Sequence, residues 1–155
     1  MKKMRRKDRA ITEEEIIALL NKVEYGVLST VSENGKPYGV PLNFCFIDHC
    51  IYFHCAVEGH KIDNIKQNKS VSFCAVGNTE ILPAKFGTKY ESIIVSGEVE
   101  EVFDVNKQIA LEGIIHKYSP EFIDKGIKYI EGEKKEKTKV FKITIEKLTG
   151  KARKQ

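Results

Sequence analysis

Apolar residues recur at helical spacing near the N-terminus, directly after a short acidic stretch. Thr12 is followed three residues later by Glu15, which is the pattern of a capping box at a helix start. The apolar positions that follow lie three or four residues apart, at Ile16, Leu19, Leu20 and Val23. This spacing places them on one face of a helix, so the pattern predicts a helix over residues 12–23.

Three further segments show helical patterns. A short one spans 60–67, with Ile62 and Ile65 on one side. A longer one begins at Asp104 or Val105 and continues through residue 115. The last begins at Ser119-Pro120, where a capping residue precedes a first-turn proline, and extends to about residue 130. Residues 132–139 are predicted to be a charged linker.

The remaining apolar runs are short, and turn signals separate them. They predict six strands, over 25–31, 38–47, 51–56, 70–76, 90–102 and 141–145. Asn34-Gly35 indicates a tight hairpin, Pro41 an edge or a bulge, and Gly97 a bend or bulge. Asp48-His49 can turn the chain, and residues 77–89 form the longest irregular piece. Six strands joined mostly by tight turns favour one mainly β (α+β) domain over residues 1–155, a small antiparallel barrel with peripheral helices.

The net charge of +4 arises at the two ends of the chain. Residues 1–9 and 151–155 hold nine of the 26 basic residues and one of the 22 acidic ones, which leaves 17 against 21 and a net charge of −4 for the body. We interpret both ends as solvated tails and expect no nucleic-acid partner, because such partners require clustered basic groups.

No apolar run reaches the roughly 20 residues of a membrane span, and no apolar signal core follows the basic N-terminus. We therefore expect a cytoplasmic protein without a membrane partner.

The four cysteines do not form a Cys-x-x-Cys pair. They stand at Cys45, Cys50, Cys55 and Cys74. The nearby His49 and His54 raise a zinc hypothesis, but neighbouring strand residues such as His54 and Cys55 point to opposite faces. Buried, reduced structural thiols are the better interpretation, and no metal site is expected.

Residues 51–61 carry the strongest chemical signal. A β-rich run breaks at Gly59, and a helix opens on His60-Lys61. Helix starts present unpaired N–H groups and a favourable dipole to anions, so this turn suits a phosphate. His54 lies just upstream, which suggests a phosphorylated cofactor with a histidine near its reactive part. Alternatives stay open: Lys61 as a solvated lysine, His60 as a turn cap, and His54 as a structural residue.

Several segments, in this order and spacing, resemble one superfamily over residues 4–154. They are Met4-Arg5-Arg6-Lys7-Asp8-Arg9, Val40-Pro41-Leu42-Asn43, residues 51–61, residues 90–97 and Leu148-Thr149-Gly150-Lys151-Ala152-Arg153. The chain resembles the FMN-binding split-barrel superfamily of pyridoxamine-phosphate-oxidase-like proteins, and more closely its Nim-type nitroimidazole-resistance branch.

The resemblance implies a homodimer with flavin mononucleotide (FMN) at the interface. It implies that Val40, Pro41, Leu42 and Asn43 pass the flavin ring, with main-chain groups bonding its polar edge. Asn43 would need a partner if buried, which a flavin carbonyl or N–H can supply. The family histidine near the ring matches His54. The phosphate turn matches Gly59, His60 and Lys61, with Cys55 and Ala56 assigned to the same cofactor site.

Two positions depart from the family pattern. Ser92 stands where related oxidases place a polar side chain on the flavin, but its neighbour Glu91 replaces an arginine common in this branch. Cys55 replaces a frequent serine in the phosphate shell. Pyridoxamine-phosphate oxidase itself is disfavoured, because Ser92-Ile93-Ile94 replaces the expected glutamine and arginine positions.

The resemblance implies an FMN-dependent oxidoreductase, a flavin or nitro-compound reductase. Nim-type proteins are associated with reduction of nitro groups to amines. The chain has no Gly-x-Gly-x-x-Gly after a strand, so an NAD(P)H donor would visit the open face of the flavin. His54 would orient a small-molecule acceptor or donate a proton to it.

Two alternatives stay open. The first is a non-catalytic flavin or haem binding protein, in which His54 or His60 would be the axial ligand of a haem. The second is a nucleic-acid-binding module that uses the basic tails.

Overall fold

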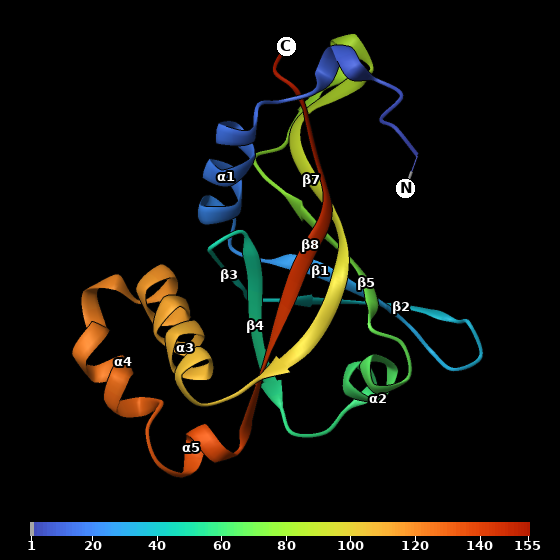
Figure 1. Ribbon diagram of the computed structural model, residues 1–155. Coiled ribbons are helices and arrows are strands. Elements are labelled where there is room, and N and C mark those ends of the chain that lie inside the picture. The colour runs from blue at the N-terminus through green and yellow to red at the C-terminus, as the bar shows by residue number, and fades with distance from the viewer. Residues whose placement is uncertain (1) are drawn as a thin grey trace.

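A computed structural model describes residues 2–155. Its eight strands are β1 (Gly26–Val31), β2 (Pro37–Leu42), β3 (Cys45–Ile47), β4 (Cys50–Ala56), β5 (Ser70–Val76), β6 (Glu80–Leu82), β7 (Gly87–Val102) and β8 (Thr138–Arg153). The sheet has the order β2-β1-β5-β7-β8-β4-β3, with β6 paired to β7 outside this path (Figure 1). All neighbours are antiparallel. The predicted mainly β fold with peripheral helices is confirmed.

The helices lie outside the sheet. They are α1 (Glu13–Lys22), α2 (His60–Gln67), α3 (Asp104–Tyr118), α4 (Ile123–Tyr129) and α5 (Glu133–Glu136), with 3-10 turns η1 (Lys7–Arg9), η2 (Pro83–Lys85) and η3 (Pro120–Phe122). The predicted capping box is present, because Thr12 Oγ1 accepts from the Glu15 N–H and Glu15 Oε2 accepts from the Thr12 N–H. In Figure 1, α3, α4 and α5 lie on one side of the end of β4 and α2 on the other.

The barrel is split where one predicted strand divides in two. The single strand predicted over 38–47 is wrong, because the chain leaves the ladder at Asn43-Phe44 and forms β2 and β3. β2 pairs with β1, whereas β3 pairs with β4, so the two halves form opposite ends of the open sheet. The turn predicted at Asp48-His49 is confirmed, and both residues have positive φ angles of 48° and 60°, as a two-residue hairpin of type I′ requires.

Three polar segments hold more structure than predicted. Residues 77–89 contain β6 and η2, and the predicted linker 132–139 contains α5. The last strand covers Thr138–Arg153 rather than 141–145, because β8 stays paired with β7 as far as Tyr90↔Arg153. The C-terminal tail is therefore partly strand. It also contacts the N-terminal segment, since the Ile11 N–H donates to the Gly150 carbonyl at 3.2 Å.

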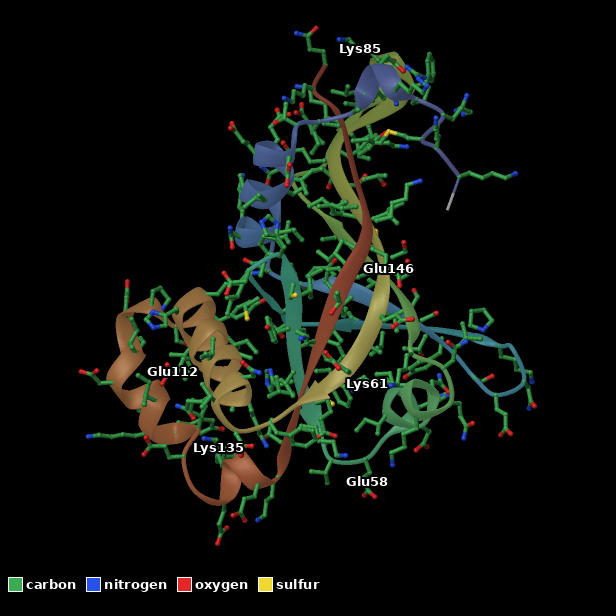
Figure 2. All side chains as sticks on the ribbon, viewed as in Figure 1. Glu58, Lys61, Lys85, Glu112, Lys135 and Glu146 are labelled. Atoms are coloured by element: carbon green, nitrogen blue, oxygen red, sulfur yellow. The ribbon has the colours of Figure 1, made fainter. Side chains whose placement is uncertain are left out.

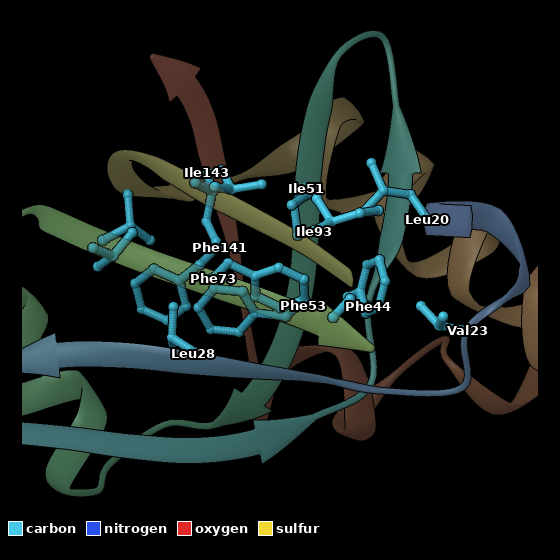
Figure 3. Packing of buried hydrophobic residues seen from close by; sticks show 14 of the residues in the cluster. Leu20, Val23, Leu28, Phe44, Ile51, Phe53, Phe73, Ile93, Phe141 and Ile143 are labelled. Atoms are coloured by element: carbon cyan, nitrogen blue, oxygen red, sulfur yellow. The ribbon is translucent and has the colours of Figure 1, made fainter. Parts of the chain in front are cut away.

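The core fills the inside of the barrel (Figure 3). Its largest fully buried side chains include Phe44, Phe53, Phe73, Leu28, Ile51, Ile93 and Ile143.

The irregularity predicted at Gly97 is a register shift between Ser96 and Gly97 in the pairing of β7 with β8. A Cβ at Gly97 would lie 2.2 Å from the Thr144 carbonyl oxygen, so only glycine fits there. All four cysteines are free thiols, and burial raises the pKa of Cys45 to about 11.

A buried hydrogen bond fixes α2 against β1. Asn64 Nδ2 donates to Thr30 Oγ1 at 3.0 Å, and both residues are buried. Asn64 therefore orients the helix whose first turn carries His60 and Lys61. The apolar side chains Ile62 and Ile65 complete the buried face.

Asn64→Ala is expected to lower the free energy of unfolding by about 1–3 kcal/mol, because the buried Thr30 hydroxyl loses its partner. Urea denaturation of the single variants and of Thr30→Val/Asn64→Ala measures the coupling. The double variant should cost less than the sum of the singles, since it leaves no orphaned group. Additive costs would contradict this role.

Candidate functional site

The turn between β4 and α2 has the geometry of an anion site. Gly59 has a φ of 149° and precedes the first residue of α2, and no side chain caps that helix start. The first-turn N–H groups therefore face outward without intrahelical partners. Lys61 is half-buried and makes no ion pair with any carboxylate of residues 2–155. Figure 2 places Lys61 between α2 and the end of β4. An uncompensated ammonium beside a helix start suits a phosphate.

His54 lies on the outer face of β4, close to this turn. Phe53 is buried in the core and Cys55 packs against it, so strand alternation turns His54 outward, as predicted. Partial burial lowers the pKa of His54 below its ordinary value, and the positive charge of Lys61 lowers it further. The imidazole is therefore neutral near pH 7, with one nitrogen donating and the other accepting.

Cys55 and Ala56 occupy opposite faces at the end of β4. Cys55 packs against the core, and burial raises its pKa, so its thiol points away from the face of His54. Ala56 is exposed opposite Thr138 of β8, on the same face as His54. The two residues therefore contribute differently: Ala56 borders the turn, whereas Cys55 supports it from inside the barrel.

The predicted ring-binding segment is an open edge. β2 is a terminal strand of the sheet, so main-chain groups on its outer side have no strand partner. Val40 and Leu42 pack against the core, while Pro41 is exposed, in agreement with the predicted edge position. Asn43 is exposed rather than buried, and its Nδ2 donates to the Glu24 carbonyl at 3.3 Å. Its partner is thus a backbone oxygen of this chain.

Aromatic stacking joins β2 to the phosphate turn. The rings of Tyr38 and His60 are stacked, with centroids 4.1 Å apart and an interplanar angle of 26°. The open edge of β2 and the start of α2 are therefore neighbours in space. The sequence did not indicate this contact, since Tyr38 and His60 lie on separate elements.

His54 opens onto a cavity that the sequence did not reveal. The cavity measures about 670 Å³ and lies between the β4–β8 side of the barrel and helices α3, α4 and α5. Tyr118 lines it and ties it to the corner after β2: its hydroxyl donates to the Glu24 carbonyl at 2.7 Å and accepts from the Phe44 N–H at 3.1 Å. Neighbouring Lys117 donates to the Phe44 carbonyl at 3.0 Å. The only sequence signal was the dense lysine run near residues 134–139.

Ser92 lies far along the barrel from His54 within one chain. Ser92 pairs with Lys151 of β8, whereas His54 pairs with Val140 near the other end of that strand. At ~3.3 Å per residue, the two partner positions Val140 and Lys151 are roughly 35 Å apart along β8. The assignment of Ser92 to the flavin, which the resemblance places at a dimer interface, stays a prediction.

The family of the chain follows from its sequence as well as this fold. Residues 12–152 match the family model described as Pyridoxamine 5'-phosphate oxidase, so the chain belongs to that family. A sequence comparison with curated proteins finds no match. Among residues 2–155, no helix is long and apolar enough to cross a bilayer.

Solved structures share the fold at low identity. A candidate 5-nitroimidazole antibiotic resistance protein from Bacteroides thetaiotaomicron is 23% identical with a TM-score of 0.75, covering 92% of this chain and 86% of its own. A FAD-binding protein from Mesorhizobium loti is 23% identical with a TM-score of 0.67, and the match covers 94% of this chain and 97% of that protein. A FAD and haem binding protein from Mycobacterium smegmatis is 13% identical with a TM-score of 0.80, and the match covers 95% of this chain and 74% of that protein. These likenesses support the split-barrel fold alone.

Proposed function

We propose that the protein is an FMN-dependent oxidoreductase that reduces flavins or nitro compounds with electrons from NAD(P)H. One observation carries this proposal: Lys61, which has no carboxylate partner among residues 2–155, is a half-buried ammonium beside the uncapped start of α2, next to His54. A phosphate on a redox cofactor would satisfy both the ammonium and the free N–H groups. The similar FAD-binding structures support a flavin on this fold.

The residues present fit FMN. Gly59, His60 and Lys61 would hold the phosphate, and the open edge of β2 at Val40–Leu42 would offer main-chain groups to the polar rim of the ring. Asn43 stands at the end of that edge. The bound flavin supplies electron transfer, while the protein binds and orients the reactants.

His54 acts on the acceptor in this proposal. Its neutral imidazole faces the cavity, where its N–H can donate a hydrogen bond to an acceptor oxygen and hold that group in place. Similarity to a candidate 5-nitroimidazole antibiotic resistance protein supports a nitro group as the acceptor. The four free thiols suit a reducing compartment, so we place the protein in the cytoplasm.

We further propose a homodimer formed by the outer face of the sheet. Uncharged side chains form an in-register row across five strands: Pro41, Val27, Cys74, Ile94 and Thr149. The neighbouring row continues with Gly39, Ser29, Ser72 and Ser96. Ile94 is 44% exposed on this face. A second copy packed there would cover the apolar row, and it offers the route by which Ser92 reaches the flavin of the other subunit.

Ile94→Glu is expected to give a monomer that has lost most of its FMN, because it places a charge within the buried interface. Light scattering combined with the flavin-to-protein ratio measures both effects. Val105→Glu is the matched control, since Val105 is 71% exposed on α3 and lies outside this face. A fully FMN-loaded monomer at high dilution would contradict the interfacial site.

Titration of the apo-protein with FMN and with riboflavin tests the proposal. The two ligands differ only in the phosphate, so FMN should bind far more tightly and riboflavin should bind weakly. Anaerobic addition of NAD(P)H should then bleach the bound flavin. Equal affinities, or a bound flavin that no nicotinamide nucleotide reduces, would count against the proposal.

A haem-binding role is the second candidate. His54 is neutral and opens onto a largely apolar cavity, which suits an axial ligand. His60 is less suited, because its ring is stacked on Tyr38. A Soret band that disappears in His54→Ala would favour this role over flavin chemistry.

A further inference from the structure

We propose that the cavity beside His54 binds a planar aromatic carboxylate, and that the acceptor of the reaction is a member of this class that carries a nitro group, which takes up the electrons supplied by NAD(P)H. The carboxylate site is inferred from the cavity itself. Its role as the acceptor site rests on the proposed flavin function.

The walls of the cavity suit an aromatic body. Apolar side chains from three elements surround it, chiefly Leu111, Ile114, Ile115, Phe122 and Ile130. Tyr118 and Tyr129 add two more rings. A volume of about 670 Å³ falls within the usual range of pockets for small organic ligands. Flat apolar ligands bind such walls through burial and ring stacking.

The charges around the cavity suit an anion. Four lysines line it, Lys125, Lys134, Lys135 and Lys137, and none of its lining residues is acidic. Lys135 Nζ donates to Gln108 Oε1 at 2.6 Å, and the exposed Lys137 pairs loosely with Glu133 at 3.5 Å. Within the described part of the chain Lys134 has no carboxylate partner, and its Nζ lies 3.3 Å from the centre of the Tyr129 ring. Positive charge is thus concentrated at the opening of an apolar space, and only Lys137 of the four lysines has a carboxylate partner among residues 2–155.

His54 and the lysines define an orientation for the ligand. Figure 2 shows Lys135 among the helices, across β4 from Lys61. A carboxylate held by Lys134 and Lys125 would leave the aromatic end directed toward His54, on the side of the proposed flavin site. The lysines then bind the carboxylate end of the ligand, while the other end, which carries the nitro group, lies beside His54.

Isothermal titration with 2-naphthoate and its neutral analogue 2-naphthamide tests this site. The carboxylate should bind the apo-protein at least tenfold more tightly than the amide. Lys134→Met and Lys125→Met should each weaken naphthoate by about fivefold to tenfold and leave naphthamide unchanged. Lys128→Met is the control, because Lys128 lies exposed on α4 outside the cavity lining.

A cavity-filling variant, Ile114→Trp, should abolish binding of both compounds, with circular dichroism checking the fold. Equal affinity for the acid and the amide, undiminished naphthoate binding in Lys125→Met/Lys134→Met, or no binding of either compound would overturn the proposal. Because the titration uses apo-protein, it tests the carboxylate site independently of the proposed flavin function. FMN binding without naphthoate binding would refute only the carboxylate site, and naphthoate binding without FMN binding would refute only the flavin function.

Discussion

Lys61→Ala is expected to weaken FMN binding by roughly 10- to 100-fold, since a charge-assisted contact contributes about 1.5–3 kcal/mol. Lys61 is the only half-buried lysine at the start of α2, and it has no carboxylate partner among the described residues, so its removal leaves the phosphate with helix N–H groups alone. Riboflavin, which lacks the phosphate, should bind the variant and the unmodified protein equally. Quenching of flavin fluorescence on binding measures both ligands.

Two variants sharpen this prediction. Lys66→Ala removes an exposed lysine from the last turn of the same helix and should leave FMN binding unchanged. Lys61→Arg keeps the charge and should retain most of the affinity. Unchanged FMN affinity in Lys61→Ala, or an equal loss of riboflavin, would refute the assignment of Lys61 to the phosphate.

His54→Ala is expected to leave FMN affinity nearly unchanged and to slow reduction of the acceptor by about 10²–10⁴-fold, the usual contribution of a positioned acid or base. The physical reason is location: the His54 side chain lines the cavity, whereas the proposed phosphate position is at the start of α2. Stopped-flow measurement separates the two half-reactions. Flavin reduction by NAD(P)H should keep its rate, and only flavin reoxidation by the acceptor should slow.

The matched control is His49→Ala, which removes a histidine from the β3–β4 turn without touching the cavity. It should behave like the unmodified protein in both half-reactions. A normal reoxidation rate in His54→Ala would show that the imidazole takes no part in acceptor reduction, and release of FMN from that variant would show that it serves the cofactor instead.

Features encoded by neighbouring residues could be predicted from the sequence. The Thr12–Glu15 capping box, the turn at Asp48-His49 and the irregularity at Gly97 each depend on a few adjacent positions, and all are present. The break at Gly59 before α2 is likewise a local feature, whereas its role as a phosphate site stays a prediction. Residues 54–61 are contiguous, so the local break at Gly59 was enough to bring His54 and Lys61 together.

Features that depend on distant pairing could not be predicted. The break at Asn43-Phe44 exists because β2 and β3 find different neighbours, which no local pattern specifies. The extra length of β8 likewise follows from its pairing with the whole of β7. Ser92 was assigned to the site by resemblance alone, and its pairing with Lys151, far along β8 from the partner of His54, was not evident from the local sequence.

The cavity was missed for a related reason. Helical spacing indicated the residues that later form α3 and α4, but not the surface against which those helices pack. Tyr118 anchors α3 to the Phe44 corner by hydrogen bonds to backbone atoms. Every residue has the same backbone groups, so the sequence does not indicate which of them Tyr118 will bind. The cavity between these helices and β4 could therefore be recognised only in the structure.

The absorbance spectrum of the freshly purified protein, followed by denaturation and identification of the released chromophore, tests the central claim most directly. A flavin spectrum with about one FMN released per chain is the predicted result. A protein that remains colourless after incubation with FMN would contradict the flavin site at Gly59-His60-Lys61, and with it the proposed function.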